Sequence, residues 1–262
     1  MKNNESKKPF YKAIDNEIEI FKNCHQTRLP LLLKGPTGCG KSRFVDAMAF
    51  ELDLPLITVA CNEDTSATDL VGRFLIKGNE TVWQDGPLTR AVRSGGILYL
   101  DEVIEAREDV IVLIHSLSDY RRLLYIDALA ETVSAPASFQ LVLSYNPGYQ
   151  KSFKELKAST RQRFVALNFN YPKPETEAHI IQNETGVDEK HAKALVGLAN
   201  KIRSLSELGL AESASTRLLV NAAHLIRTGV NPRLAGEVAV ANALTDDADA
   251  TRALKDLVAL YF

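Results

Sequence analysis

The residues best suited to chemistry form a glycine-rich stretch, GPTGCGKS, near the beginning of the sequence. The stretch matches the pattern G-x-x-x-x-G-K-[ST] in full, follows a short apolar run and precedes apolar residues at helical spacing. Glycines let the backbone curl until its N–H groups point at phosphate oxygens, and a helix beginning there adds the positive end of its dipole. The pattern therefore predicts a site for ATP or GTP. The alternatives are a chance match and a loop for another anion.

The last two residues of this stretch have separate tasks. Lys41 would reach the β- and γ-phosphates, and the hydroxyl of Ser42 would be a ligand of Mg²⁺. We therefore predict ATP and Mg²⁺ as the cofactors. The residues predicted to bind the nucleotide are Gly35, Pro36, Thr37, Gly38, Cys39, Gly40, Lys41 and Ser42.

A second candidate for chemistry is a pair of carboxylates at the end of an apolar strand, in GGILYLDE. Asp101 is predicted to hold Mg²⁺, usually through water, and Glu102 to polarise the attacking water. Paired carboxylates alone are common on protein surfaces. After a phosphate loop in the same domain, however, this pair matches the Walker B pattern. A glutamate directly after the aspartate is associated, at the level of protein families only, with hydrolysis rather than transfer to a small metabolite.

Composition limits the remaining function classes. The chain has 262 residues, with 31 basic and 33 acidic side chains and a net charge of −2, so no strong field attracts nucleic acid or an anionic membrane. Its three cysteines, Cys24, Cys39 and Cys61, lack C-x-x-C spacing, which argues against a zinc site or a disulfide framework. We expect neither a signal peptide nor a bilayer-spanning segment. These features predict a cytoplasmic protein.

The order of predicted elements indicates an α/β domain followed by a helical one. Apolar runs alternate with helices, which favours a parallel sheet flanked by helices. Two segments, 76–86 and 121–136, resemble hairpins, and within the second we expect strand 123–126 to pair with strand 131–134. Beyond the proline-rich stretch 171–175 only helices are predicted. We expect two domains, residues 1–172 and residues 173–262. The predicted strands are 31–33, 55–62, 97–100, 140–146 and 164–169, of which 31–33, 97–100 and 140–146 are expected to be buried.

Taken together and in this order, the motifs resemble those of AAA+ ATPases of the MoxR group, and within it the CbbQ, NirQ and NorQ subfamily, with CbbQ most alike. The likeness runs from about residue 21 to the last residue. Ser42 stands where threonine is frequent, and either hydroxyl can bind magnesium. The resemblance implies a P-loop AAA+ α/β domain and a C-terminal all-α lid. It is carried by GPTGCGKSRF, ATDLVGRF, ETVWQDGPLTRAV, GGILYLDE, SYNPGY, STRQRF and STRLL.

The resemblance also implies roles for four polar residues. Asn146 corresponds to sensor 1, which positions the attacking water; the alternative is a turn asparagine before Pro147. Arg161 and Arg163 lie in the arginine-finger region, where a neighbouring subunit supplies charge in trans, with a slight preference for Arg163. A surface ion pair is the alternative for either. Arg217 corresponds to sensor 2 on the lid, or else is an ordinary first-turn helix arginine.

The family implies a ring, usually a hexamer, in which ATP hydrolysis remodels a client protein. The two hairpin segments would face the central pore, and Trp83 would either touch the partner or pack within its own hairpin. CbbQ-like members act with an adaptor that carries a von Willebrand factor A domain, and their client is Rubisco, from which inhibitory sugar phosphates are removed. NirQ- and NorQ-like members mature nitric oxide reductase. The Rubisco interpretation is favoured here. A nucleic-acid motor and a monomeric metabolite phosphotransferase are the remaining alternatives.

Overall fold

A computed structural model of the protein describes residues 8–147, 156–205, 210 and 212–262. By their contacts, the described residues divide into two units. The first contains Asp15–Lys34 and most of Lys41–Asn168. The second contains Phe10–Ile14, Gly35–Gly40 and the described part of Phe169–Phe262. The phosphate loop thus groups by contact with the C-terminal stretch, although it is covalently continuous with the first unit on both sides.

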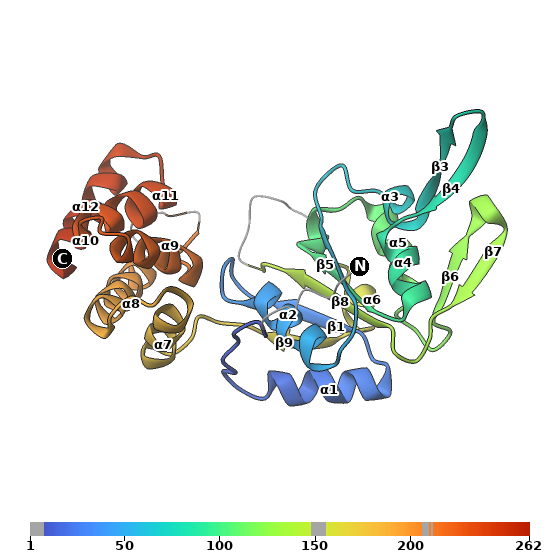
Figure 1. Ribbon diagram of the computed structural model, residues 1–262, viewed down its shortest axis with the longest axis horizontal. Coiled ribbons are helices and arrows are strands. Elements are labelled where there is room, and N and C mark those ends of the chain that lie inside the picture. Colours follow the sequence, from blue (N-terminus) through green and yellow to red (C-terminus); the bar gives the residue numbers. More distant parts are fainter. Residues whose placement is uncertain (1–7, 148–155, 206–209, 211) are drawn as a thin grey trace. The chain divides into compact units, whose positions relative to one another are not determined.

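A five-stranded parallel sheet forms the centre of the first unit, in the order β2-β5-β8-β1-β9 (Figure 1). Parallel neighbours need crossover connections, and helices provide them, as the alternating pattern predicts. This confirms the expected α/β fold. In register, Leu33 lies opposite Ser144, and Leu100 lies opposite Leu143. The strands are β1 (Leu31–Lys34), β2 (Leu56–Ala60), β5 (Ile97–Asp101), β8 (Gln140–Tyr145) and β9 (Val165–Asn168).

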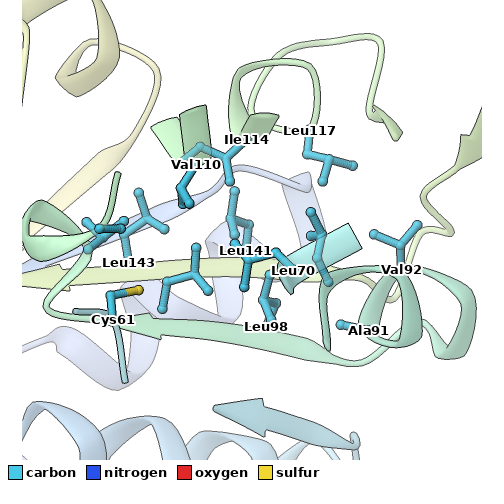
Figure 2. Packing of buried hydrophobic residues seen from close by; sticks show 14 of the residues in the cluster. Cys61, Leu70, Ala91, Val92, Leu98, Val110, Ile114, Leu117, Leu141 and Leu143 are labelled. Carbon is cyan, nitrogen blue, oxygen red and sulfur yellow. The ribbon is translucent and has the colours of Figure 1, made fainter. Parts of the chain in front are cut away.

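One face of the sheet packs against α3 (Ala67–Val71), α4 (Pro87–Ser94) and α5 (Glu108–His115). Figure 2 shows this core, in which leucines of β5 and β8 meet apolar side chains of the three helices. Residues alternate across a strand, so Leu98 and Leu100 enter this core while Tyr99 points to the opposite face. The alternation decides which side chains reach the site described below.

The helices α1 (Glu17–Thr27) and α2 (Lys41–Glu51) lie apart from that cluster. Their Phe21 and Phe44 rings meet edge to face, with centroids 5.5 Å apart, and both side chains are fully buried. α2 also contacts β5. This second apolar layer holds the beginning of α2 near the sheet, where the phosphate loop ends.

Two antiparallel hairpins extend from the first unit (Figure 1). The hairpin of β6 (Leu123–Ile126) and β7 (Glu131–Ser134) has the bounds that the sequence predicts. The hairpin of β3 (Gly72–Lys77) and β4 (Glu80–Asp85) begins four residues before the predicted 76, because Gly72, with φ of 137°, ends α3 and starts the strand. Arg93 of α4 links the two, pairing with Asp85 at 3.2 Å and with Glu131 at 2.6 Å.

Trp83 packs within its own hairpin. Its ring meets Phe74 edge to face at 5.1 Å, and its indole N–H donates to Asp85 Oδ1 at 2.7 Å. Other apolar side chains of the hairpin are exposed, including Ile76, whose exposed fraction is 83%. Of the two roles considered for Trp83, these contacts support intramolecular packing.

The C-terminal stretch of the second unit is helical, as predicted. Its helices share one apolar core, and four begin at side chains that accept a backbone N–H: Asp188, Ser215, Asn231 and Asp247. A π-helical turn at Glu237–Ala241 follows directly after the helix Pro232–Gly236. Within the described ranges, no helix combines the length and apolarity needed to cross a membrane. The α-helices are α7 (Pro174–Thr185), α8 (Glu189–Ser204), α9 (Thr216–Arg227), α10 (Pro232–Gly236), α11 (Asn242–Leu244) and α12 (Ala248–Tyr261).

Candidate active site

The phosphate loop connects the end of β1 to the beginning of α2. Gly38 and Gly40 have φ angles of 68° and 102°, a conformation that favours glycine. α2 begins at Lys41, so the loop ends at a helix N-terminus, where backbone N–H groups lack intrahelical partners. The stretch GPTGCGKS therefore has the strand–loop–helix setting in which such a sequence binds phosphate.

Within the second unit, the loop approaches the start of α9 closely. A Cβ atom added to Gly38 would lie 2.7 Å from the Cβ of Ser215 and 3.3 Å from the Cβ of Arg217. Ser215 is the N-cap of α9, and Arg217 is an exposed residue of its first turn. Arg217, the residue predicted as sensor 2, thus lies beside the predicted phosphate-binding loop.

Thr37 of the loop has two further contacts in the same unit. Its hydroxyl donates to Glu212 Oε1 at 2.8 Å, and its carbonyl accepts a hydrogen bond from the Tyr171 hydroxyl at 3.3 Å. The guanidinium of Arg203 lies over the Tyr171 ring, 3.9 Å from its centroid. Sequence patterns had not indicated Tyr171, Arg203 or Glu212, because their only signal is proximity in space.

Asp101 is surrounded by hydroxyl groups at the end of β5. Tyr99 donates to its Oδ1 at 2.7 Å, and Ser144 of β8 donates to the same oxygen. The Ser42 hydroxyl lies 3.3 Å from Asp101 Oδ2. The structure thus brings together Ser42 and Asp101, the two predicted magnesium ligands. It adds Tyr99 and Ser144, which sequence reasoning missed.

Glu102 follows in an unusual backbone conformation. Its φ is 52°, in the left-handed region that side chains other than glycine, asparagine and aspartate rarely adopt. Its N–H donates to Ser144 Oγ at 3.2 Å. Such a conformation costs about 1–3 kcal/mol and persists where the surroundings hold it. The predicted catalytic carboxylate therefore sits at a strained turn, which is common at active sites.

Burial raises the pKa of Glu102, and the negative charges of Asp101 and Glu105 add to the effect. The positive charge of Lys41 lowers this pKa, as does a hydrogen bond from the Asn146 backbone, but burial dominates. Lys41 is itself only 5% exposed. A half-buried carboxylate of raised pKa near a buried lysine is the arrangement expected of a general base.

Asn146 lies one residue after β8, and its backbone hydrogen bond to Glu102 brings the predicted sensor 1 next to the predicted base. The β5 and β8 strands are neighbours in the sheet, so their ends meet at one edge. The last two residues of SYNPGY, Gly148 and Tyr149, lie outside the described residues.

The two candidate finger arginines differ in their surroundings. Arg163 is half-buried and pairs with Asp119 at 3.6 Å, and Asp119 also pairs with Arg121 at 2.6 Å. Arg161, at the end of the short helix α6 (Ala158–Arg161), is exposed and forms no salt bridge among the described residues. The structure thus commits Arg163 to a contact within its own chain and leaves Arg161 at the surface.

The donor set fits a magnesium–nucleotide complex. Among the described residues no three histidine, cysteine or acidic side chains cluster as a metal site would require. Mg²⁺ in nucleotide enzymes instead takes one or two protein oxygens, with phosphate and water oxygens as the rest. Ser42 Oγ and Asp101 Oδ2 are such a pair and would hold the ion.

Comparison with known proteins agrees with both units. Residues 30–164 match the AAA domain (dynein-related subfamily), and residues 177–261 match the CbbQ/NirQ/NorQ C-terminal family. The chain belongs to the CbbQ/NirQ/NorQ family. This bears out the resemblance inferred from the motifs. As a member of this family, the chain is a nucleotide-binding ATPase of the AAA class.

Relatives of all three names are similar to this chain to the same degree. Protein CbbQ of Hydrogenophilus thermoluteolus is 55% identical, over 94% of this chain and 92% of that protein. The denitrification regulatory protein NirQ of Pseudomonas aeruginosa is 56% identical, over 97% of each. Protein NorQ of Paracoccus denitrificans is 55% identical, over 97% of this chain and 94% of that protein. Similarity therefore does not favour CbbQ over the other two.

Solved structures share the fold at low identity. A protein of Cytophaga hutchinsonii aligns with a TM-score of 0.53 and 20% identity, over 95% of this chain and 90% of that one. A RuvB variant of Thermotoga maritima aligns with a TM-score of 0.55 and 14% identity, over 92% of this chain and 68% of that one. At these identities the likeness concerns the fold alone.

Proposed function

We propose that this chain hydrolyses ATP with Mg²⁺ and uses the reaction to remodel a client protein. The observation that carries the proposal is the half-buried Glu102, beside Asp101 and within electrostatic reach of Lys41, at the sheet edge that follows the phosphate loop. In this proposal residues 1–172 are the nucleotide-binding domain and residues 173–262 the lid. The protein would act in the cytoplasm.

Each site residue has a task that its chemistry suits. The loop from Gly35 to Ser42 binds the phosphates, and Lys41 meets the β/γ end. Ser42 and Asp101 would hold Mg²⁺, which would supply positive charge against the phosphates. Glu102 accepts a proton from the attacking water, and its raised pKa makes it a stronger base at neutral pH.

Two further residues complete the proposed site. Asn146 orients the attacking water next to Glu102. Arg217 on the lid contacts the phosphates, which its position beside Gly38 supports.

We further propose that Arg161 is the arginine finger of a neighbouring subunit's site. A finger must project from the surface to reach that site. Arg161 is exposed, whereas Arg163 pairs with Asp119 of its own chain. This reverses the slight preference for Arg163 drawn from the sequence.

Mixed assemblies test the trans role. Arg161→Ala subunits and Lys41→Ala subunits should each be inactive alone, since comparable fingers contribute about 10³ to 10⁵ in rate. Co-assembled, they should regain turnover wherever an Arg161→Ala site faces an intact Arg161 from a Lys41→Ala neighbour. Native mass spectrometry checks co-assembly. Recovery with Arg163→Ala instead, and none with Arg161→Ala, would reverse the assignment.

The ring, the adaptor and the client belong to the same proposal. We propose a closed hexameric ring, as in the family, which cooperates with an adaptor carrying a von Willebrand factor A domain. The client proposed is Rubisco, which the resemblance of the motifs to CbbQ favours. Nitric oxide reductase is the alternative, because relatives named CbbQ, NirQ and NorQ are equally similar to this chain. The two hairpins would contact the client or adaptor. Their exposed apolar side chains support that role. The net charge of −2 supports no nucleic-acid partner.

Two assays separate the clients. Rubisco inhibited by a sugar phosphate should recover carboxylation when the chain, its adaptor and ATP are added, and should not recover with Glu102→Gln. If nitric oxide reductase is the client, cells that lack the chain should make that enzyme in an inactive form, and the wild-type chain should restore it. Mass photometry in the presence of ATP tests whether the subunits form a ring. If the wild-type protein does not hydrolyse ATP, the whole proposal is refuted.

A further inference from the structure

The polar side chains around Asp101 come from two strands that are distant in sequence. Tyr99 and Asp101 are two residues apart on β5, so their side chains share one face of the sheet. Ser144 lies on β8, which is the neighbour of β5. Tyr99 Oη donates to Asp101 Oδ1 at 2.7 Å, and Ser144 Oγ donates to the same Oδ1. A single carboxylate oxygen is therefore held by two hydroxyl groups.

Both hydroxyl groups are deep in the protein. Tyr99 is 1% exposed and Ser144 is fully buried. A buried hydroxyl without a partner costs free energy, so these groups keep their hydrogen bonds and with them the orientation of the carboxylate. The other oxygen, Asp101 Oδ2, is thereby directed at Ser42, whose hydroxyl lies 3.3 Å away. One oxygen is committed to the protein and the other is presented where the metal would bind.

Ser144 also holds the backbone of the next residue. Its single proton goes to Asp101, and its oxygen accepts the N–H of Glu102 at 3.2 Å and lies 3.1 Å from Tyr99 Oη. Because Glu102 has a φ of 52°, this hydrogen bond supports a conformation that the chain would otherwise leave. The same hydroxyl thus orients the carboxylate of Asp101 and the peptide of Glu102.

We propose that Tyr99 and Ser144 are positioning residues for the magnesium–nucleotide complex. Tyr99 acts on the two predicted metal ligands, Asp101 and Ser42, whose hydroxyl lies 3.4 Å from Tyr99 Oη, and Ser144 acts on both Asp101 and Glu102. This inference rests on the proposed function, since it concerns the same site. It predicts different defects for the two residues. Loss of the Tyr99 hydroxyl weakens metal binding only. Loss of the Ser144 hydroxyl weakens metal binding and also impairs the chemical step.

Calorimetry of ADP binding, in MgCl₂ and in EDTA, tests this inference without requiring turnover. In Tyr99→Phe and in Ser144→Ala, affinity in EDTA should stay at the wild-type value, while the gain in affinity on adding Mg²⁺ should fall about 10-fold, as is typical when a partner of a metal ligand is removed. In ATPase assays, excess Mg²⁺ should restore kcat in Tyr99→Phe but not in Ser144→Ala. Tyr120→Phe and Ser94→Ala serve as controls, because each removes the same kind of hydroxyl group from an exposed residue of the same unit.

The outcomes separate the inference from the proposed function. If Mg²⁺ does not change the ADP affinity of the wild type, the proposed function is refuted. If Mg²⁺ raises the ADP affinity of the wild type and of both variants equally, only the inference is refuted. An equal loss of affinity in EDTA and in Mg²⁺ would also refute it, because a general structural defect would explain that result. Thermal unfolding checks each variant. If Tyr99→Phe does not fold, Ser144→Ala decides, since it removes a donor to the same oxygen.

Discussion

Two acidic side chains, Glu102 in the first unit and Glu177 in the second, differ in how far neighbouring groups compensate their buried negative charge. Glu177 is fully buried, and Arg203 binds both of its oxygens at 2.7 Å while Thr216 donates to one of them at 2.6 Å. Glu102 is half-buried with a raised pKa, because burial and two neighbouring carboxylates outweigh Lys41. A buried acid that is fully paired has a structural role, because removal of its partner would leave a buried charge uncompensated. One that stays poorly compensated is available to take up a proton.

The sharpest difference should follow from neutralising each acid. Glu102→Gln keeps the shape of the side chain and removes its negative charge, so turnover should fall about 10² to 10⁴-fold, while ATP affinity and the free energy of unfolding stay near the wild-type values. Phosphate release and calorimetry measure both quantities. Wild-type turnover in this variant would remove Glu102 from the mechanism.

The opposite result is expected at the paired acid. Arg203→Met leaves the carboxylate of Glu177 buried without its partner, so the free energy of unfolding should fall by about 3–5 kcal/mol. Denaturant titration measures it. The double variant Glu177→Met, Arg203→Met should recover most of that loss, because apolar side chains then fill the same space, although Thr216 loses its acceptor. If the double variant is as unstable as the single one, the ion pair contributes to the free energy of unfolding beyond compensating two buried charges.

The smallest expected effect concerns pH. Glu102 accepts a proton only when ionised, so turnover should fall as pH decreases through its pKa, which lies above the usual 4.5. The negative charge of Glu105 raises that pKa, so Glu105→Gln should lower it and move the acidic fall in kcat to lower pH. Bound Mg²⁺ acts on both proteins alike, so the difference between their profiles reports the charge of Glu105. Identical profiles, or a shift to higher pH, would contradict the assignment of the acidic limb to Glu102.

The sequence predicts those parts of the site that are contiguous in the chain. GPTGCGKS and GGILYLDE carry their own chemistry in their spacing, and the β6–β7 hairpin has the predicted bounds because its turn is local. The roles of Asn146, Arg161, Arg163 and Arg217 come from the family resemblance and stay predictions.

The partners of Asp101 could not be predicted in the same way. Ser144 reaches Asp101 only because β5 and β8 are neighbours, and a serine within an apolar strand gives no sign of which side chain it meets. Tyr99 was within the motif but read as one of its apolar residues. The contact of Arg163 with Asp119 is likewise set by tertiary structure, so the sequence gives no sign of it, and the choice between Arg161 and Arg163 stays a prediction.

The backbone of Glu102 has a consequence for anyone who redesigns this protein. A sequence chosen only to suit this backbone would place glycine at position 102, because glycine adopts a φ of 52° without the steric penalty that glutamate carries. Sequence design that considers only the stability of this backbone would thus remove the proposed base while it raises the free energy of unfolding. Such a procedure must therefore be told to keep Glu102 despite its backbone conformation.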